Sequence, residues 1–192
     1  MARYGKEHKQ STRRRIIEAA GPRLKRDGID GSGVSVLMAD AGLTNGALYA
    51  HFASKEDLVA TAVADQLRQQ LERYRAQGSD HEGIEQLVRD YLSTQHRDDP
   101  AHGCPSAALL DEIGRCGDTT KHAYTDGILK LVDVIASRLA PSDPQSARAQ
   151  TLSLFALLIG TLQLSRALAD RRLADQVLER GIENALALLP GE

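Results

Sequence analysis

The sequence predicts an all-α fold of about nine helices. Apolar residues recur every three or four positions along almost all of the 192 residues, which is the spacing of one helix face. Runs that alternate between apolar and polar residues, which indicate strands, do not occur in the sequence, nor do internal repeats. With 42% hydrophobic and 26% charged residues, a chain of this length can bury a core without metals or disulfides.

The first predicted helix covers residues 11–25. Asp27 and Gly28 end it, because glycine favours the position that follows a helix. Pro22 lacks an N–H group, so the pair Gly21-Pro22 should kink this helix or start a new turn. The buried face of the helix comprises Ile16, Ile17, Ala20 and Leu24.

A pair of short helices follows. The first covers 34–41 with Ser32 as its N-cap, and after a break at Gly42 the second covers 45–52 with Thr44 as its N-cap. Ser54 is placed to cap a longer helix. Asp57 stands where a capping box has Glu or Gln, and its shorter side chain reaches back less well.

The remainder of the chain predicts longer helices separated by glycines, prolines and polar turns. The helix that Ser54 begins should end at 78–80, and Pro105 suits the first turn of a later helix. We expect one domain over 1–54 and a larger helical domain over 55–192. The other predicted helices cover 81–97, 105–114, 118–140, 145–169 and 172–189.

The net charge of −2 conceals an asymmetry along the chain. Residues 1–26 contain nine Lys and Arg against two Glu, whereas residues 61–192 carry a net charge of −5. A basic amino-terminal segment on an acidic body indicates that this segment meets a polyanion. A solvated helix face would also explain the charge, so composition alone does not decide between the two.

The segment 34–52 has the pattern of a helix-turn-helix. Two short helices meet at a turn that begins with Gly42, and the second helix presents small or polar residues outward, as suits the major groove of DNA. Thr44, Tyr49, His51 and Lys55 fit contacts to phosphates. The basic arm, represented by Arg3, Lys6, Lys9 and Arg13, is expected at flanking phosphates or in the minor groove.

The sequence around this motif resembles the TetR (tetracycline-repressor) family of bacterial regulators over roughly residues 10–60. The matching residues are IIEAA at 16–20, DGI at 27–29 and AGLTNGALYAHFASKEDL at 41–58. The resemblance implies a dimer that binds a pseudo-palindromic operator, with a ligand pocket in the larger helical domain. It also implies that Thr44, Tyr49, His51 and Lys55 hold phosphates while Asn45, Gly46 and Ala47 meet base edges.

Two departures from the family pattern affect the expected contacts. Gly33 and Val36 replace polar residues near the start of the second helix, which leaves Ser32 and Ser35 as candidate hydroxyl contacts. Because the outward residues are so small, Asn45 is the best base reader, and we expect the shape of the DNA and the arm to contribute to specificity.

The last two helices are expected to form a four-helix dimer interface, chiefly because the resemblance implies one. Packing within a single protomer is the alternative. The apolar positions assigned to the interface are Leu154, Phe155, Leu158, Ile159, Leu162, Val177, Ile182, Ala185 and Leu189.

The middle helices, over 81–140, are expected to enclose an effector pocket that includes His96, Cys104, Leu109, Tyr124 and Ile128. Cys104 precedes Pro105 at a helix N-terminus, where the helix dipole favours a thiolate. The surrounding sequence HGCPSAALLDE resembles a segment of some family members, in a few of which a cysteine senses electrophiles. A thiol sensor is therefore the alternative to a non-covalent effector, and a small buried capping residue is the plainest explanation of Cys104.

Several function classes are excluded at this stage. The chain has no arrangement of nucleophile and base, no phosphate-binding loop and no compact set of metal ligands, so we expect no enzyme activity, cofactor or metal. A disulfide between Cys104 and Cys116 is not expected, since they are about 18 Å apart along a continuous helix. With no signal peptide and no membrane span, the chain reads as cytoplasmic. The resemblance implies a bacterial protein, associated with the nucleoid when bound, whose partners are DNA, a small effector and a second copy.

Overall fold

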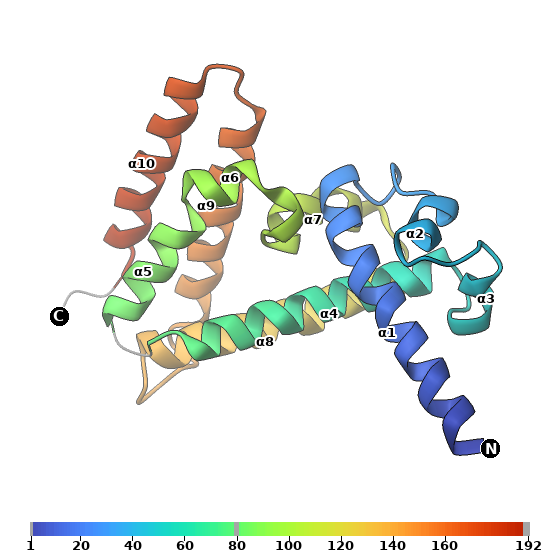
Figure 1. Ribbon diagram of the computed structural model, residues 1–192. Coiled ribbons are helices and arrows are strands. Elements are labelled where there is room, and N and C mark those ends of the chain that lie inside the picture. Colours follow the sequence, from blue (N-terminus) through green and yellow to red (C-terminus); the bar gives the residue numbers. More distant parts are fainter. Residues whose placement is uncertain (1, 79–80, 190–192) are drawn as a thin grey trace.

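The computed structural model describes residues 2–78 and 81–189, with side chains for 7–78 and 82–189, and confirms the all-α prediction (Figure 1). These residues form helices, turns and irregular segments. The elements are α1 (Ala2–Asp27), α2 (Val34–Asp40), α3 (Ala47–His51), α4 (Lys55–Ala76), α5 (His81–Tyr91), α6 (Thr94–Asp98), the 3-10 turn η1 (Pro100–His102), α7 (Pro105–Arg115), α8 (Asp118–Leu139), α9 (Arg148–Ala167) and α10 (Arg171–Ala187).

The helices form a small head and a larger body. The head contains α1, α2 and α3, and α4 runs from it into the body, where it packs along α8 (Figure 1). The pair α9 and α10 forms the far side of the body, away from α2 and α3. One hydrophobic cluster extends from Ile16 in α1 to Leu189, so the core continues across the boundary expected after residue 54.

The first helix is longer than predicted and is not interrupted. It begins at Ala2 rather than residue 11, and it continues through Gly21 and Pro22 to Asp27. Side chains on both sides of the proline, Ile16 and Leu24 among them, are fully buried, and this packing offsets the main-chain hydrogen bond that Pro22 cannot make. A methyl group at Gly21 would overlap the amide of Gln66, so this glycine lets α1 approach α4 closely.

The turn between α2 and α3 is built on Gly42. This residue has a φ of 66°, and its N–H donates to the Ala39 carbonyl at 2.9 Å, while the Leu43 N–H donates to the Met38 carbonyl at 2.9 Å. These two bonds form a Schellman motif, which satisfies the last carbonyls of α2 and turns the chain toward α3.

Two predicted caps are wrong. The residues at the N-cap positions of α2 and α3 are Gly33 and Gly46, and neither helix has a side-chain cap. The Ser32 hydroxyl donates instead to the Gly28 carbonyl at 2.6 Å, and α3 begins at Ala47, two residues later than predicted. Thr44 contributes its carbonyl, which accepts the Ala47 N–H at 3.0 Å.

The cap of α4 forms as predicted. The Ser54 hydroxyl accepts the Asp57 N–H at 3.1 Å. The Asp57 carboxylate reaches back to the Ala53 N–H at 2.9 Å, one residue before the usual target of a capping box.

The helix predicted over 81–97 is two helices. It ends at Tyr91, and the Ser93 hydroxyl accepts the His96 N–H at 3.2 Å to start α6. The remaining helices lie within three residues of their predicted bounds. No helix in the described residues is long and apolar enough to span a membrane.

Candidate nucleic-acid interface and regulatory cavity

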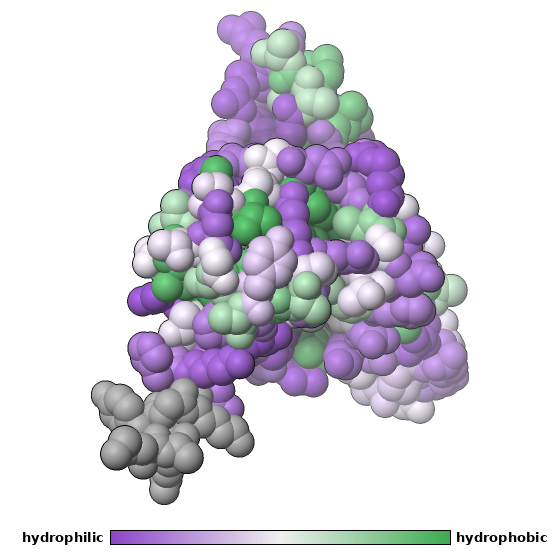
Figure 2. All heavy atoms as spheres, turned by 90° about the vertical axis from the view of Figure 1, so that its right-hand side faces the viewer, coloured by the Kyte–Doolittle hydropathy of each residue, from purple (hydrophilic) through white to green (hydrophobic). Residues whose placement is uncertain are grey.

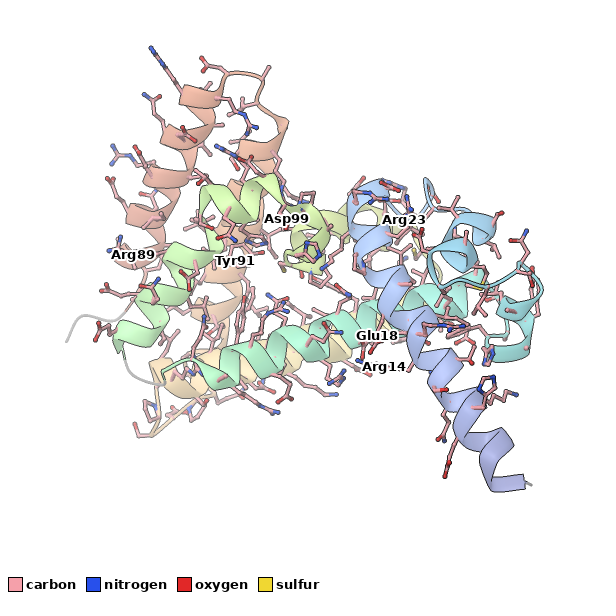
Figure 3. The ribbon with its side chains drawn as sticks, in the orientation of Figure 1. Arg14, Glu18, Arg23, Arg89, Tyr91 and Asp99 are labelled. Carbon is pink, nitrogen blue, oxygen red and sulfur yellow. The ribbon has the colours of Figure 1, made fainter. Side chains whose placement is uncertain are left out.

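A network of charged side chains fixes α2 against α1. The Arg23 guanidinium donates to both carboxylate oxygens of Asp40, at 2.5 and 2.7 Å, and to Asp27 at 2.7 Å (Figure 3). Its hydrogen bonds hold the pKa of the Asp40 carboxyl below its usual value. Paired, forked hydrogen bonds of this kind set direction as well as distance, so they orient the helix pair on α1.

The outward face of α3 and of the turn before it consists of small and polar residues, as predicted. Leu48 is fully buried and anchors the helix, whereas Asn45, Gly46 and Ala50 are exposed and Tyr49 has an exposed fraction of 71%. Figure 2 views this side of the head, which is largely hydrophilic with scattered apolar patches. A slim helix with one projecting aromatic ring has the dimensions that the major groove admits.

A basic groove lies between α1 and α3. It has a volume of about 440 Å³ and is lined by His8, Lys9, Thr12 and Arg15 of α1 and by His51 of α3, among others. Burial, followed by the charges of Lys9, Arg13 and His8, lowers the pKa of His51. Sequence reasoning missed His8, Thr12 and Arg15 as groove residues. Thr12 and Arg15 lie inside the predicted helix, at helical spacing from His8 and on the side of Lys9, whereas His8 precedes the predicted start of that helix.

The predicted DNA contacts do not all face solvent. Ser35, Thr44 and Lys9 are exposed, and Ala47 and His51 are half-buried. Arg3 and Lys6 lie outside the described side chains.

Three of the other predicted contacts have partners within the protein. Ser32 is fully buried, which contradicts its assignment as a DNA contact. Lys55 donates to the Ile29 carbonyl at 2.6 Å, and the Arg13 guanidinium lies 4.6 Å from the centre of the Phe52 ring.

The body is hydrogen-bonded to the head at two points, one in the loop between α1 and α2 and one in α1 itself. The Glu112 carboxylate of α7 accepts the Asp30 N–H at 3.0 Å. At the other end of α7, the ammonium of Lys25 in α1 donates to the Gly103 carbonyl at 2.8 Å. Both ends of α7 are thus tied to the head.

A cavity of about 260 Å³ opens beside Gly103, between α4, α5 and the segment leading to α7. Of the predicted pocket residues, His96 and Cys104 line it. The other three do not line it: Leu109 is a core residue, Ile128 packs at the core's edge, and Tyr124 donates to the Ser106 hydroxyl at 3.0 Å.

His96 joins two segments of the cavity wall. Its Nδ1 lies 2.7 Å from the Tyr91 carbonyl, and its Nε2 accepts the Cys104 N–H at 2.9 Å, which places the proton on Nδ1. Burial, with the charges of Arg166, Lys25 and Arg73, lowers the pKa of His96 to about 4. The ring is therefore neutral at neutral pH.

Cys104 and Cys116 occupy opposite ends of α7, and both are free thiols. Cys104 is buried, with an exposed fraction of 3%. Cys116 is half-buried, and burial raises the pKa of its thiol. Their separation by the whole of α7 leaves no geometry for a disulfide between them.

Most of the residues predicted for the dimer interface belong to the core of the protomer. Seven of the nine have exposed fractions of 9% or less, which leaves them little area to bury against a partner, and only Val177 and Ile182 are half-buried. The seven are Leu154, Phe155, Leu158, Ile159, Leu162, Ala185 and Leu189. The exposed apolar residues of α9 form a different row, Leu152, Ala156, Gly160 and Leu164, spaced four apart.

Comparison with known proteins finds a family match over the head and similar folds over almost the whole chain. Residues 16–62 match the family model described as bacterial regulatory proteins, tetR family. The search of curated proteins gives no match.

Solved structures match almost the whole chain in fold. Reduced NemR of E. coli is 16% identical with a TM-score of 0.78, and the alignment covers 95% of this chain and 98% of that one. A TetR-family regulator from Agrobacterium tumefaciens is 21% identical with a TM-score of 0.76, covering 95% and 100%. FadR of Bacillus subtilis in complex with stearoyl-CoA is 16% identical with a TM-score of 0.63, covering 88% and 96%.

Proposed function

We propose that this chain is a TetR-family transcriptional regulator, and that it acts as a homodimeric repressor that a small-molecule effector releases from a pseudo-palindromic operator. The observation that carries the proposal is the α2–α3 pair, which Arg23 fixes on α1 and which presents the exposed face of α3. Residues 1–54 would read DNA, and 55–192 would bind the effector and the second copy. Such a protein acts in the bacterial cytoplasm.

The proposed mechanism is a shift between two populations. A dimer that binds one operator sets its two reading helices one DNA turn apart, about 34–36 Å. An effector releases DNA only if it binds more tightly to the conformation of the dimer in which the two reading helices are not one DNA turn apart. The links from α7 to Asp30 and Lys25 provide a path by which the body could change the position of the head.

Selection of bound duplexes from a random pool at two salt concentrations tests the DNA-binding role. Enrichment of a pseudo-palindrome, with affinity that falls steeply as salt rises, is the expected result. No enrichment at either salt, from protein shown by mass spectrometry to carry neither a ligand nor an oxidised cysteine, would overturn the proposal.

Charge substitutions on the α1 groove sharpen this test. Lys9→Ala and Arg15→Ala should each weaken operator binding and reduce the slope of log affinity against log salt by about one, because each removes a phosphate contact. Arg180→Ala, which removes an exposed charge from α10, is the matched control and should leave the slope unchanged. Unchanged slopes in both groove variants would exclude the groove from the interface.

A thiol sensor at Cys104 is the second candidate function. Its thiol stands at the N-terminus of α7 near the cations Lys25 and Arg166, and one structure of similar fold is of a reduced form. Peroxide would oxidise the thiolate to a sulfenic acid and be reduced to water. Release of DNA by peroxide that is lost in Cys104→Ser and kept in Cys116→Ser supports this candidate, and release unaffected by Cys104→Ser eliminates it.

A further inference from the structure

The cavity beside Gly103 contains buried polar atoms that have no partner in the protein. Gln70, with an exposed fraction of 3%, donates through Nε2 to the Tyr74 hydroxyl at 2.7 Å, but its Oε1 has no partner. Exchanging the amide oxygen and nitrogen would leave the other atom unpartnered instead. Gln77 Oε1 and the Tyr91 hydroxyl also lack partners, although the Cys104 thiol lies beside the latter.

Such atoms are costly unless something binds them. A buried polar group without a hydrogen bond destabilises the folded state. All three side chains line the same cavity, and they come from α4, its C-cap and α5. Tyr91, labelled in Figure 3, is the last residue of α5. This convergence indicates a ligand site with hydrogen-bonding groups already in place.

Three cations lie at or beside the Gly103 side of the cavity: Arg73 lines it and is exposed, whereas buried Lys25 and half-buried Arg166 stand behind Gly103 without lining it. Lys25 and Arg166 donate only to main-chain carbonyls, and Arg73 lines the cavity itself. None of the three forms an ion pair with a carboxylate in the described part of the chain. Burial, followed by the charges of Arg73 and Arg166, lowers the pKa of Lys25 to about 8. The field at this end is therefore positive.

The carboxylates of the cavity lie at its rim. Asp90 and Asp99 are both exposed, and each already accepts a hydrogen bond, from Gln86 at 2.7 Å and from His102 at 2.8 Å. Solvent screens exposed charges more than buried ones, so these carboxylates offset the charges of buried Lys25 and half-buried Arg166 only in part, while exposed Arg73 is screened as they are. The N-terminus of α7 at Cys104, which has no side-chain cap, adds partial positive charge.

Part of the cavity wall is aromatic and apolar. Tyr74 and Tyr91 present their rings, and Leu87 lies beside them. A volume of about 260 Å³ is at or below the range of ordinary drug-binding pockets, so the ligand must be small.

We propose that this cavity binds a small aromatic carboxylate, whose charge lies at the Arg73 and Lys25 end and whose ring lies between Tyr74 and Tyr91. This inference rests on the proposed function and names the chemical class of its effector. Tyr91 donates its hydroxyl proton to the carboxylate, and Arg73 contributes a charge-assisted hydrogen bond. Because Lys25 belongs to α1, a negative charge at this end acts directly on a residue of the head.

Three ligands of one size and different charge test the proposal: benzoate, benzamide and benzylamine. Thermal shift and titration calorimetry on the full chain should show binding of benzoate, with weaker or no binding of neutral benzamide and cationic benzylamine. Arg73→Gln should weaken benzoate binding about tenfold, and Tyr91→Phe, which keeps the ring, should weaken it by a smaller factor. Arg75→Gln is the control, because Arg75 lies on α4, pairs with Glu72 and does not line this cavity.

The possible outcomes separate this inference from the function it rests on. Tighter binding of benzylamine than benzoate, or no binding of any of the three, would overturn the carboxylate class. Equal loss in Arg73→Gln and Arg75→Gln would overturn the site. A protein that binds its selected DNA but not benzoate refutes this inference alone, and one that binds benzoate but no DNA refutes the proposed function alone.

Discussion

His96 shows how one side chain can make a structure depend on pH. Its neutral ring donates to the Tyr91 carbonyl and accepts from the Cys104 N–H, and a second proton on Nε2 would break the latter bond. The ring therefore connects the end of α5 to the start of α7 only while it is neutral.

We expect acid to weaken the fold through this residue. The pKa of His96 is about 4 in the folded state against 6.5 ordinarily, so the unfolded chain binds more protons between these values. The contribution of His96 is complete above pH 6.5 and falls by ~2 kcal/mol on acidification to pH 4.5. Urea unfolding of the wild type and of His96→Gln at several pH values measures this loss. Taking the difference between their free energies of unfolding removes the effect of the carboxylates, which both proteins share. Parallel pH profiles would contradict the prediction.

Residue roles were predictable where the backbone alone determines them. Ser54 caps α4 because its position before a helical run is visible in the sequence. Ser32 and Lys55 were placed at DNA, yet they bond to the carbonyls of Gly28 and Ile29. Those partners belong to the compact turn after α1, and no spacing rule reveals them.

At the scale of elements, caps and breaks determine where helices end. The split between α5 and α6 depends on Ser93, which caps α6 through the His96 N–H, although the apolar pattern continues up to it. The extension of α1 to Ala2 could not be predicted for a different reason. Its first residues are polar and show no apolar periodicity that would indicate a helix.

The cap of α4 should contribute measurably to stability. Ser54→Ala removes the acceptor for the Asp57 N–H, and we expect a loss of about 1 kcal/mol in the free energy of unfolding. Ser137→Ala in α8 is the control, since the Ser137 hydroxyl bonds only to a carbonyl of its own helix. Chemical denaturation measures both, and equal effects would show that the cap adds nothing.

At the scale of the whole molecule, the sequence predicted two functional regions but misassigned the surface of one. Apolar residues on α9 and α10 serve both the protomer core and any contact with a second copy, and periodicity cannot separate these uses. The structure separates them: Leu158 and Leu162 point into the protomer, while Leu152 and Leu164 have exposed fractions of 47% and 52%.

We expect the exposed row of α9 to hold the proposed dimer together. Gly160 lies in this row with no atom near its Cα that a side chain would meet, so Gly160→Glu places a charge in the interface without disturbing the protomer. Sedimentation should show monomers for this variant. Gly114→Glu, at an equally open helical glycine in α7, should leave the dimer intact. A dimeric Gly160→Glu variant would show that another surface mediates association.

The two ties between α7 and the head limit how this protein can be recombined. Lys25 depends on a carbonyl of the body, and the Asp30 main chain depends on Glu112. A head joined to a foreign body would keep its reading surface but lose both anchors unless the new body supplied them. If α3 reads DNA as proposed, its specificity is therefore easiest to change by substitution on α3, and the head and α7 are better regarded as one structural unit than as separable modules.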